Sequence, residues 1–468
     1  MTRSVSDRPV EVRIPIHPRS VRGRFRNLKT GILVLAYGVY FLLPWLRWTR
    51  EYGPNQAILF DLPNRRFYIF DLIVYPQDIF WLAGFLIIAA MLLFFVTGIA
   101  GRVFCGYFCF QTLWTDVFMR IERWIQGERP ARLRLAAAPW NREKLLKMIA
   151  TWSSWLGVSF LTAFAFILYW GNAPDIVIWF FTGEAPPAAY ITTFILTATT
   201  FLFAGVLREQ TCTLLCPYAR FQSVMFDRDT LMVSYDERRG EGELGRAKPL
   251  RERKTREERI AAGYGDCIDC GYCVQVCPTG IDIRDGLQVS CIHCALCIDA
   301  CDSIMDKQGW PRGLIGYTSE RAQQGAPTRL IKGKTIGYGL SIVIVVGLLA
   351  VSILSRGDLD ASLSQVRQPL YVQMSDGRVQ NSYDLKLNSK VQEYLPLEFE
   401  LEGLPAPELD FGLLEQVVLE PDQRLTVALR IRHSATGLTD SPTPFRLVIR
   451  HAIDGRELGS VQSQFSHR

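Results

Sequence analysis

This chain is best understood from one stretch of its sequence, Cys267-Ile-Asp-Cys270-Gly-Tyr-Cys273-Val-Gln-Val-Cys277-Pro278. Three cysteines stand at steps of three, a fourth stands at a step of four, and a proline follows. Beginning 24 positions later, the spacing is repeated in Cys291-Ile-His-Cys294-Ala-Leu-Cys297-Ile-Asp-Ala-Cys301. The first run matches the bacterial pattern C-x2-C-x2-C-x3-C-P, which binds [4Fe-4S] clusters. The repeat therefore predicts two such clusters.

The ligands of the two predicted clusters are crossed between the runs. Three closely spaced thiolates contact one face of a cubane, and the remaining corner needs a cysteine from the other run. We therefore expect a small α+β domain of the bacterial two-cluster ferredoxin type over residues 259–310. The predicted ligands are Cys267, Cys270, Cys273 and Cys301 for the first cluster, and Cys291, Cys294, Cys297 and Cys277 for the second.

Zinc is the alternative metal, because it also binds four thiolates. Zinc ligands usually come as two Cys-x-x-Cys pairs separated by a longer loop, so the repeated triplets favour iron–sulfur clusters. In the second run Asp302 stands where the pattern has proline, which affects the local turn but not the ligands. Because four thiolates are already present, we interpret His293 as a solvated or sulfur-contacting residue and not as a ligand.

Four further cysteines form two pairs with a different spacing, Cys105 with Cys109 and Cys212 with Cys216. Residues four apart lie on one face of a helix, so each pair presents two sulfurs together. Each pair follows a long apolar segment, and the four thiols would converge if those segments were adjacent. We interpret them as candidate copper or redox thiols. A third cluster and four well-packed small side chains are the alternatives.

Polar side chains surround these two pairs near the predicted edge of the membrane. Such residues either extend to water or line a proton or quinol site, and the first interpretation is the simpler one for each of them. They are Arg102, Gln111, Trp114, Asp116, Arg208, Glu209, Tyr218, Arg220 and Gln222.

Five segments are apolar and long enough to cross a bilayer, which takes about 20 helical residues. They are residues 30–46, 79–98, 148–170, 188–207 and 336–354. A soluble protein would need an implausibly large core to bury five such helices. The sequence, which is 49% hydrophobic, therefore predicts a five-helix transmembrane bundle.

Basic residues predict how the bundle is oriented. Residues 1–29 and the loop between the second and third segments are rich in Arg and Lys, whereas residues 171–187 contain neither. Only Arg65 and Arg66, in the first outer loop, run against this pattern. We expect a cytoplasmic N-terminus and, after five crossings, a periplasmic C-terminus. All twelve cysteines would then lie on or near the cytoplasmic side, where thiols stay reduced.

The last third of the chain contains no cysteine and alternates apolar with polar residues. The alternation predicts strands over residues 383–387, 397–401, 425–431 and 445–450, and Asp376-Gly377 and Asp454-Gly455 mark turns. We expect a small antiparallel β-sandwich without disulfides over residues 355–468.

The remaining parts connect these domains. A cytoplasmic N-terminal segment (1–29) precedes a four-span membrane domain (30–207). Residues 208–258 connect it to the ferredoxin-type domain, and residues 311–335 connect that domain to the fifth span (336–354). The charged residues 236–259 favour a solvated linker, with a patch for anionic lipid or a partner as the alternative. With 52 Lys+Arg against 46 Asp+Glu, the chain is not expected to bind nucleic acid.

Four long motifs are similar to those of the cytochrome c oxidase accessory proteins, a family called CcoG and also FixG or RdxA. They are GRVFCGYFCFQTLWTDVFMRIER (101–123), REQTCTLLCPYARFQSVMFDRDTLMVSYD (208–236), GDCIDCGYCVQVCPTGIDIRDGLQVSCIHCALCIDACDSIMDK (265–307) and WPRGLIGYTSE (310–320). The resemblance covers nearly the whole chain and implies an immunoglobulin-like fold for the C-terminal domain. The family's first short motif usually reads Cys-x-x-x-Cys-Pro, and here Phe110 replaces the proline.

The resemblance implies a multi-pass protein of the bacterial inner membrane that takes part in assembling the cbb-type oxidase. It would reduce Cu(II) to Cu(I) and supply Cu(I) to copper chaperones, with oxidase assembly factors as further partners. The sequence contains no Gly-rich dinucleotide or P-loop fingerprint, so electrons must come from an unidentified partner or membrane carrier. Two alternatives stay open: a quinol-oxidising subunit that feeds another reductase, and a non-enzymatic scaffold for oxidase assembly.

Overall fold

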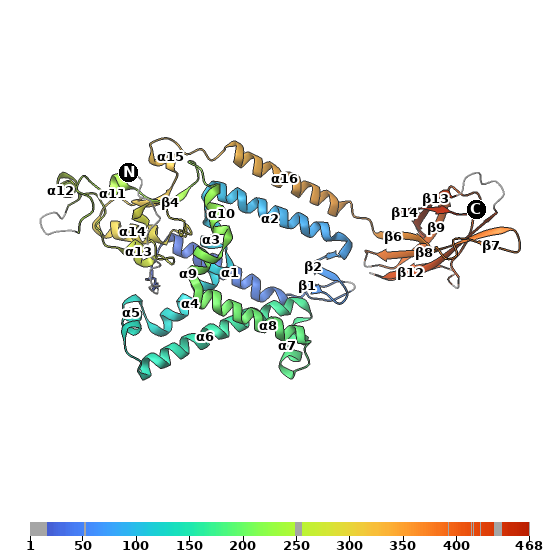
Figure 1. The fold of residues 1–468 in the computed structure, drawn as a ribbon, viewed down its shortest axis with the longest axis horizontal. Coiled ribbons are helices and arrows are strands. Elements are labelled where there is room, and N and C mark those ends of the chain that lie inside the picture. The colour runs from blue at the N-terminus through green and yellow to red at the C-terminus, as the bar shows by residue number, and fades with distance from the viewer. Residues whose placement is uncertain are drawn as a thin grey trace. The chain divides into compact units, whose positions relative to one another are not determined.

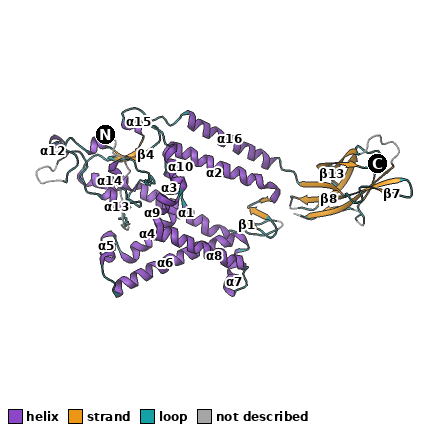
Figure 2. Cartoon of the chain, viewed as in Figure 1, coloured by secondary structure: helices purple, strands orange, loops and turns teal. Residues whose placement is uncertain are grey.

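The computed structural model describes residues 16–50, 53–248, 255–391, 393–412, 414, 416–421, 423–434 and 442–467. Residues 1–15 of the predicted N-terminal segment and residues 249–254 of the predicted linker lie outside this part of the chain. The chain forms two compact units. The first runs mainly up to Gly347 and the second mainly from Leu348 to the C-terminus, and each is described by itself (Figures 1 and 2).

Within the described residues, five helices are long and apolar enough to cross a membrane, so the chain is a membrane protein. They coincide with the five segments predicted from the sequence. The apolar stretches are Arg24–Trp45, Ile79–Ala100, Arg142–Trp170, Pro187–Leu215 and Gly333–Leu354. They contain α1 (Arg24–Leu42), α2 (Ile79–Ala100), α6 (Arg142–Ile167), α8 (Pro187–Thr200) and α16 (Gly333–Leu354).

The fourth apolar stretch extends past residue 207, where the sequence analysis ended it. After α8 the chain continues as a π-helix, η4 (Phe201–Leu207), one turn of α-helix, α9 (Arg208–Gln210), and a second π-helix, η5 (Thr211–Leu215). The amide of Cys216 donates to Thr211 O at 2.8 Å, the spacing of a π-turn. Since π-turns are rare and occur mostly at functional sites, this segment is a candidate functional element. It contains Cys212.

Shorter helices follow the second and fourth apolar stretches. After the second come α3 (Val103–Tyr107), α4 (Phe110–Gln126) and α5 (Arg129–Ala137), and after the fourth comes α10 (Pro217–Met225). α4 is amphipathic, and its buried face packs on α6 and η4 through Phe118, Trp155 and Ala204. Phe118 and Trp155 stack with ring centroids 5.6 Å apart. α6 begins at Asn141, whose side chain accepts the Lys144 amide at 2.8 Å.

The loops on the far side of the apolar helices contain elements that the sequence analysis did not predict. β1 (Ile58–Asp61) and β2 (Arg66–Ile69) pair as an antiparallel hairpin, and β3 (Leu72–Val74) follows. Between the third and fourth apolar helices lies α7 (Ala173–Thr182). These strands are only three or four residues long, which is too short for an alternation to be recognised.

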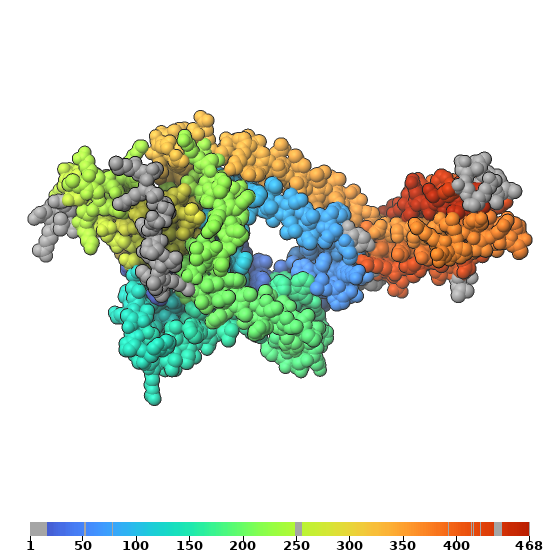
Figure 3. Space-filling view, in the orientation of Figure 1, coloured from blue at the N-terminus to red at the C-terminus, as the bar shows by residue number. Residues whose placement is uncertain are grey.

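The cysteine-rich region folds around a two-stranded sheet whose strands lie outside the predicted 259–310. β4 (Met232–Tyr235) and β5 (Ile315–Thr318) are antiparallel, with Val233 opposite Tyr317. Between them lie α11 (Glu237–Gly240), α12 (Arg256–Ala261), α13 (Tyr272–Val276) and α14 (Leu296–Gln308), and α15 (Glu320–Gln323) follows. In the space-filling view the lime to yellow atoms of this segment form one continuous body (Figure 3).

The two cysteine runs repeat in backbone conformation as well as in spacing. Asp269 and Gly271 in the first run have φ of 48° and 64°. The equivalent His293 and Ala295 in the second run have φ of 52° and 59°. Gly271 and Ala295 are the N-caps of α13 and α14. The internal repeat is therefore structural, and it bends both runs around their cysteines in the same way.

About half of the described residues of the predicted solvated linker, 236–259, are exposed, and Arg239, Arg256 and Arg259 are among those that are not. Asp266 binds Arg239 at 2.6 Å and Arg256 at 2.8 Å. Arg259 is 2% exposed, and its guanidinium donates to Gly265 O at 2.9 Å and to Cys267 O at 3.3 Å. Charged side chains are buried when they are paired in this way, so a charged composition did not imply a solvated chain here.

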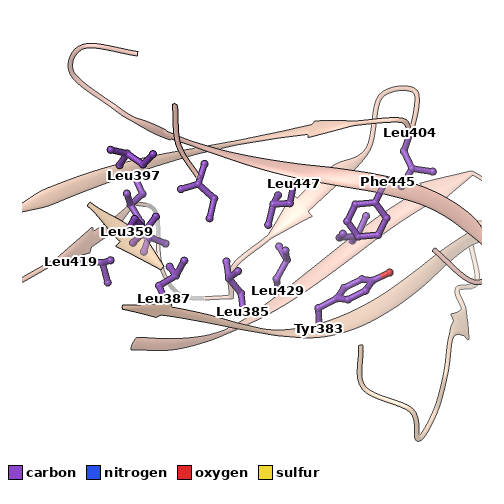
Figure 4. Packing of buried hydrophobic residues seen from close by; sticks show 14 of the residues in the cluster. Leu359, Tyr383, Leu385, Leu387, Leu397, Leu404, Leu419, Leu429, Phe445 and Leu447 are labelled. Carbon is purple, nitrogen blue, oxygen red and sulfur yellow. The ribbon is translucent and has the colours of Figure 1, made fainter. Parts of the chain in front are cut away.

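The second unit contains an immunoglobulin-like β-sandwich, as expected. One sheet has the order β10-β12-β8-β6, with β7 also paired to β8, and the other has the order β11-β9-β13-β14. Their apolar faces meet in a core that includes Tyr383, Leu385, Leu429 and Leu447 (Figure 4). The strands are β6 (Leu359–Gln365), β7 (Val372–Gln373), β8 (Arg378–Ser389), β9 (Leu395–Glu402), β10 (Glu408–Asp410), β11 (Val417–Leu419), β12 (Arg424–Ser434), β13 (Thr443–His451) and β14 (Glu457–Phe465).

Candidate iron–sulfur and thiol sites

The structure brings together the four cysteines predicted for each cluster. The first quartet (Cys267, Cys270, Cys273, Cys301) lines one small cavity, together with Tyr235, Arg284 and apolar side chains from α14 and β5. The second quartet (Cys277, Cys291, Cys294, Cys297) lines another small cavity, walled by Val233, Ile281, Ile283, Ile292 and Leu296. In each quartet three thiols come from one run and one comes from the other. Cys273 lines both cavities, so the two are neighbours.

These residues fit iron–sulfur clusters in their chemistry. Burial raises the pKa of Cys273 and of Cys291 to about 12. Such thiols stay protonated unless a metal replaces the proton, and the thiolate is the form that binds metal. The described part of the chain holds no group of three or more His, Cys, Asp or Glu side chains placed to hold a single metal ion.

The remaining four cysteines, here called the membrane-edge thiols, occupy two equivalent settings. Cys109 is the N-cap of α4 and Cys216 is the N-cap of α10, both with extended backbone. Cys105 lies in α3 and Cys212 in η5. Phe110 is the first residue of α4, where α10 has Pro217. The chain turns at Cys109 without proline, so the substitution at Phe110 does not remove the turn.

The structure brings these four thiols together. Burial, and to a smaller extent the nearby thiols Cys109, Cys212 and Cys216, raise the pKa of Cys105 to about 12, while Arg102 opposes this rise. The two pairs therefore lie near one another. The Cys105 thiol donates to Gln222 Oε1 at 3.2 Å. Within the described residues this is a grouping of thiols and not a site formed by three ligands of one ion.

Arg102 joins the thiols to the second cysteine run. Its backbone amide donates to His293 Nδ1 at 3.0 Å, and its guanidinium contacts Cys291 O at 3.4 Å and also Ala219 O in α10. His293 is 1% exposed and stacks on Phe226. Burial lowers the pKa of His293 to about 4, so the ring is neutral near pH 7. The interpretation of His293 as solvated is therefore wrong, because the ring packs under the α2–α3 turn.

Several polar residues expected to extend to water are instead buried. Arg102, Gln111, Asp116 and Gln222 are each at most 6% exposed. Asp116 accepts two hydrogen bonds from Arg26, at 2.8 and 2.9 Å. The polar character of these side chains did not predict their burial. Burial of a polar group depends on a hydrogen-bonding partner, which the residue type does not specify.

The sequence analysis missed Glu122, which lies on the buried face of α4. Arg208 binds it at 2.9 Å, and Arg132 lies 3.6 Å from it. Arg208 also stacks on Trp155, with its guanidinium carbon 4.9 Å from the ring centroid. The spacing of Asp116 and Glu122 gave no signal, because residues six apart lie about 120° from each other around a helix of 3.6 residues per turn.

Known protein domains match three parts of the chain. Residues 207–320 match a 4Fe-4S dicluster domain. Residues 80–130, which include Cys105 and Cys109, match a 4Fe-4S binding domain. Residues 349–467 match the immunoglobulin-like fold found at the C-terminus of FixG.

Three proteins are similar to this chain over most of its length. Protein RdxB of Cereibacter sphaeroides is 45% identical over 419 residues, which cover 84% of this chain and 85% of RdxB. Protein RdxA of the same organism is 43% identical over 389 residues, 81% of this chain and 80% of RdxA. The nitrogen fixation protein FixG of Rhizobium meliloti is 40% identical over 432 residues, 85% of this chain and 80% of FixG. The chain belongs to the FixG/RdxA family. An iron–sulfur electron-transfer function fits this family. It also fits the match to a 4Fe-4S dicluster domain and the match to a 4Fe-4S binding domain.

Proposed function

We propose that this FixG/RdxA-family protein transfers electrons in the bacterial inner membrane and reduces Cu(II) to Cu(I) for assembly of a cbb-type cytochrome c oxidase. The observation that carries the proposal is the grouping of all twelve cysteines. Eight line two neighbouring cavities, and four converge beside the second cavity, joined to it by Arg102. Soft thiols next to a redox centre are suited to a metal that becomes softer on reduction.

We propose the orientation that the basic residues predict, with five crossings, cytoplasmic cysteines and a periplasmic sandwich. Reduced thiols and oxygen-sensitive clusters fit the cytoplasmic side better than the oxidising periplasm. The sandwich, which contains no cysteine, tolerates the periplasm. It would then face the oxidase and its assembly factors.

The eight cysteines of the two quartets would hold one [4Fe-4S] cluster each, with the crossed ligands stated above. When bound, each cluster accepts and donates one electron. The chain supplies the surroundings. Val233, Ile283 and Leu296 keep water away from the second quartet. Arg284 lines the first cavity, where Asp269 and Asp282 neutralise its charge in two ion pairs of 2.6 Å each.

Copper is the proposed substrate, and the membrane-edge thiols are its proposed binding place. One electron converts Cu(II), which prefers nitrogen and oxygen ligands, into Cu(I), which prefers thiolate. Because burial keeps the pKa of Cys105 near 12, this thiol carries a proton that an arriving metal must displace. Cu(I) would leave to a thiol-bearing copper chaperone.

Quinol oxidation is less well supported by the structure. It would need a proton acceptor near the membrane-edge thiols. Burial alone would raise the pKa values of Asp116 and Glu122. For Asp116 the charges of Lys29 and Arg26 outweigh burial and hold its pKa below the usual range. For Glu122 a hydrogen bond from His17 and the charges of Arg208 and Arg132 do the same. Carboxylates held ionised in this way are poor proton acceptors near neutral pH.

The test is reduction of copper by the purified protein. The protein is prepared without oxygen, reduced with dithionite, freed of excess reductant and mixed with Cu(II), and Cu(I) is followed with a chelating dye. We expect rapid formation of Cu(I) by the wild type and a large loss of rate in the variant Cys212→Ala/Cys216→Ala. The substitution Ser153→Ala, at an exposed position of α6, is the control. Equal rates for wild type and the double variant would remove these thiols from the mechanism. Reduction of the protein by a quinol analogue in proteoliposomes, without copper turnover, would favour quinol oxidation instead.

A further inference from the structure

The backbone of α3 touches the second cysteine run at Gly106. A Cβ added there would lie 2.7 Å from Ile292 O and 3.0 Å from Cys294 Cα, closer than real Cβ contacts. Glycine is thus required by the close approach of two backbones. The neighbouring Tyr107 hydroxyl donates to Cys294 O at 3.1 Å. Two adjacent residues of α3 therefore hold this helix against a cysteine of the second quartet.

Cys105 lies at the same contact. It packs against the buried cluster of side chains that includes Ile292, Cys294 and Leu296. Arg102, one turn earlier, contacts Cys291 O. The thiol of Cys105 thus lies in direct packing contact with the second cysteine run. Hydrogen bonds from Arg102 and Tyr107, on either side of it in the sequence, join α3 to the same run.

The first quartet has different surroundings. The residues that line its cavity come from β4, from the cysteine runs and from the segment up to β5, and none of them comes from α2, α3 or α4. One of its cysteines, Cys270, is exposed, whereas the other seven predicted ligands are buried or half-buried. The adjoining Asp269 binds Arg284 at 2.6 Å. The first quartet therefore reaches the solvent, while the second reaches the membrane-edge thiols.

We infer that the two quartets act in a fixed order, in which electrons arrive at the first quartet near Cys270 and leave from the second across the Gly106–Cys294 contact to Cu(II) held at the thiol of Cys105. The inference rests on the proposed function and specifies the route within it. Each electron that leaves reduces one Cu(II) to Cu(I), and no bond to the protein backbone forms or breaks. A one-electron donor, dithionite in the test below, restores the reduced state.

The order is tested first by distance, without any turnover. In the full chain with the four membrane-edge thiols replaced by serine, a nitroxide is attached at Phe108→Cys, an exposed position at the end of α3. In a second sample it is attached at Ile260→Cys, an exposed position next to Arg259, which contacts Cys267 O. Pulsed EPR of the reduced protein then measures the distance to each cluster. The additional variant Cys270→Ser identifies the first cluster by changing its spectrum.

We expect the α3 label to lie nearer to the second cluster and the Ile260 label nearer to the first. The order is tested next by the rate at which the reduced clusters are reoxidised by Cu(II). Gly106→Ala is expected to slow this reoxidation several-fold while leaving iron content and the reduced EPR spectrum unchanged. Gly98→Ala is the matched control, because a Cβ there meets nothing within 4 Å, and it should behave as the wild type.

A shorter distance from the α3 label to the first cluster would overturn the inference. So would wild-type reoxidation in Gly106→Ala, provided that Cys212→Ala/Cys216→Ala is slow. If that double variant is as fast as the wild type, the proposed copper site is wrong instead. The two failures are therefore distinguishable, and the distances decide the order of the quartets even if Gly106→Ala does not fold.

Discussion

Asp116 shows how single residues hold the charged interior of this protein together. It is 3% exposed and faces Arg26 in a bidentate pair, with Arg120 3.4 Å away. A buried carboxylate of this kind is tolerated because its charge is paired and hydrogen-bonded. Asp299 of α14 acts at the beginning of α1, where its carboxylate accepts the amides of Phe25 and Arg26. Together the two aspartates fix the beginning of α1 against α4 and α14.

Asp116→Asn is expected to lower the stability of the detergent-solubilised protein by about 3–5 kcal/mol, because it leaves buried cationic groups without their counter-charge. The measurement is unfolding by denaturant, followed by loss of cluster absorbance. Glu143→Gln is the control, since Glu143 forms an exposed pair with Lys147 and should change the midpoint little. Equal midpoints for Asp116→Asn and the wild type would show that the pair is not structural.

At the scale of residues, the fixed spacing of cluster ligands predicted the eight quartet cysteines and their crossed grouping, and the structure places each predicted group of four around one cavity. The sequence did not identify Gly106 or the burial of His293. Those two depend on which segments pack together, and Gly106 and Cys294 are far apart in the chain. Spacing constrains neighbours in sequence and says little about such contacts.

The segment after α8, formed by the π-helices η4 and η5 with α9 between them, positions Cys212 in the thiol site. Gln111 of α4 donates to two backbone carbonyls of this segment, Phe203 O at 2.8 Å, which also accepts the Arg208 amide, and Arg208 O at 3.2 Å. Gln111 is 6% exposed. The position of Cys212 therefore depends on a side chain from another helix.

Gln111→Ala is predicted to destabilise this segment by about 1–3 kcal/mol, the cost of leaving a buried polar group without a partner. Hydrogen exchange should show faster exchange in residues 201–216, with the cysteine-rich region unchanged. Gln323→Ala, at an exposed position in α15, is the comparison. Unchanged protection of residues 201–216 in Gln111→Ala would mean that the wide turns are stable without this amide.

The β-sandwich can be tested as an element in the same way. Leu385 is fully buried in β8 between the two sheets, and Lys386 points outward from the same strand. Leu385→Ala should cost about 2–5 kcal/mol through lost burial and a cavity, and Lys386→Ala should cost little. Limited proteolysis of the full chain would report both, with the 4Fe-4S content unchanged. Equal resistance in the two variants would contradict the assigned core.

At this scale, prediction from sequence depended on how regularly the residues alternate. β8, β9, β12 and β13 contain long apolar side chains at every second position, and all four were predicted. β6 and β14 contain many Ser and Gln residues, so their alternation is weak, and both were missed. The order of strands within each sheet joins distant segments and was beyond local patterns.

For the whole molecule, the proposed orientation follows from charge and hydropathy and needs its own test. Alkaline phosphatase fused after the C-terminus is predicted to be active, because the sandwich would be exported. The same enzyme fused within residues 249–254, between α11 and α12, is predicted to be inactive. A cytoplasmic fluorescent protein should give the opposite pattern at the two positions. Active phosphatase at residues 249–254 would place the cysteines outside and contradict the orientation.

The most direct test of the whole account is the metal content and EPR spectrum of the full chain purified without oxygen. The account predicts two [4Fe-4S] clusters per chain, with the spectrum of a coupled pair after reduction. It also predicts that Cys301→Ala perturbs the first cluster and Cys277→Ala the second, in accord with the crossed quartets. A preparation that contains zinc and no iron, or in which each variant perturbs the cluster of its own run, would contradict it.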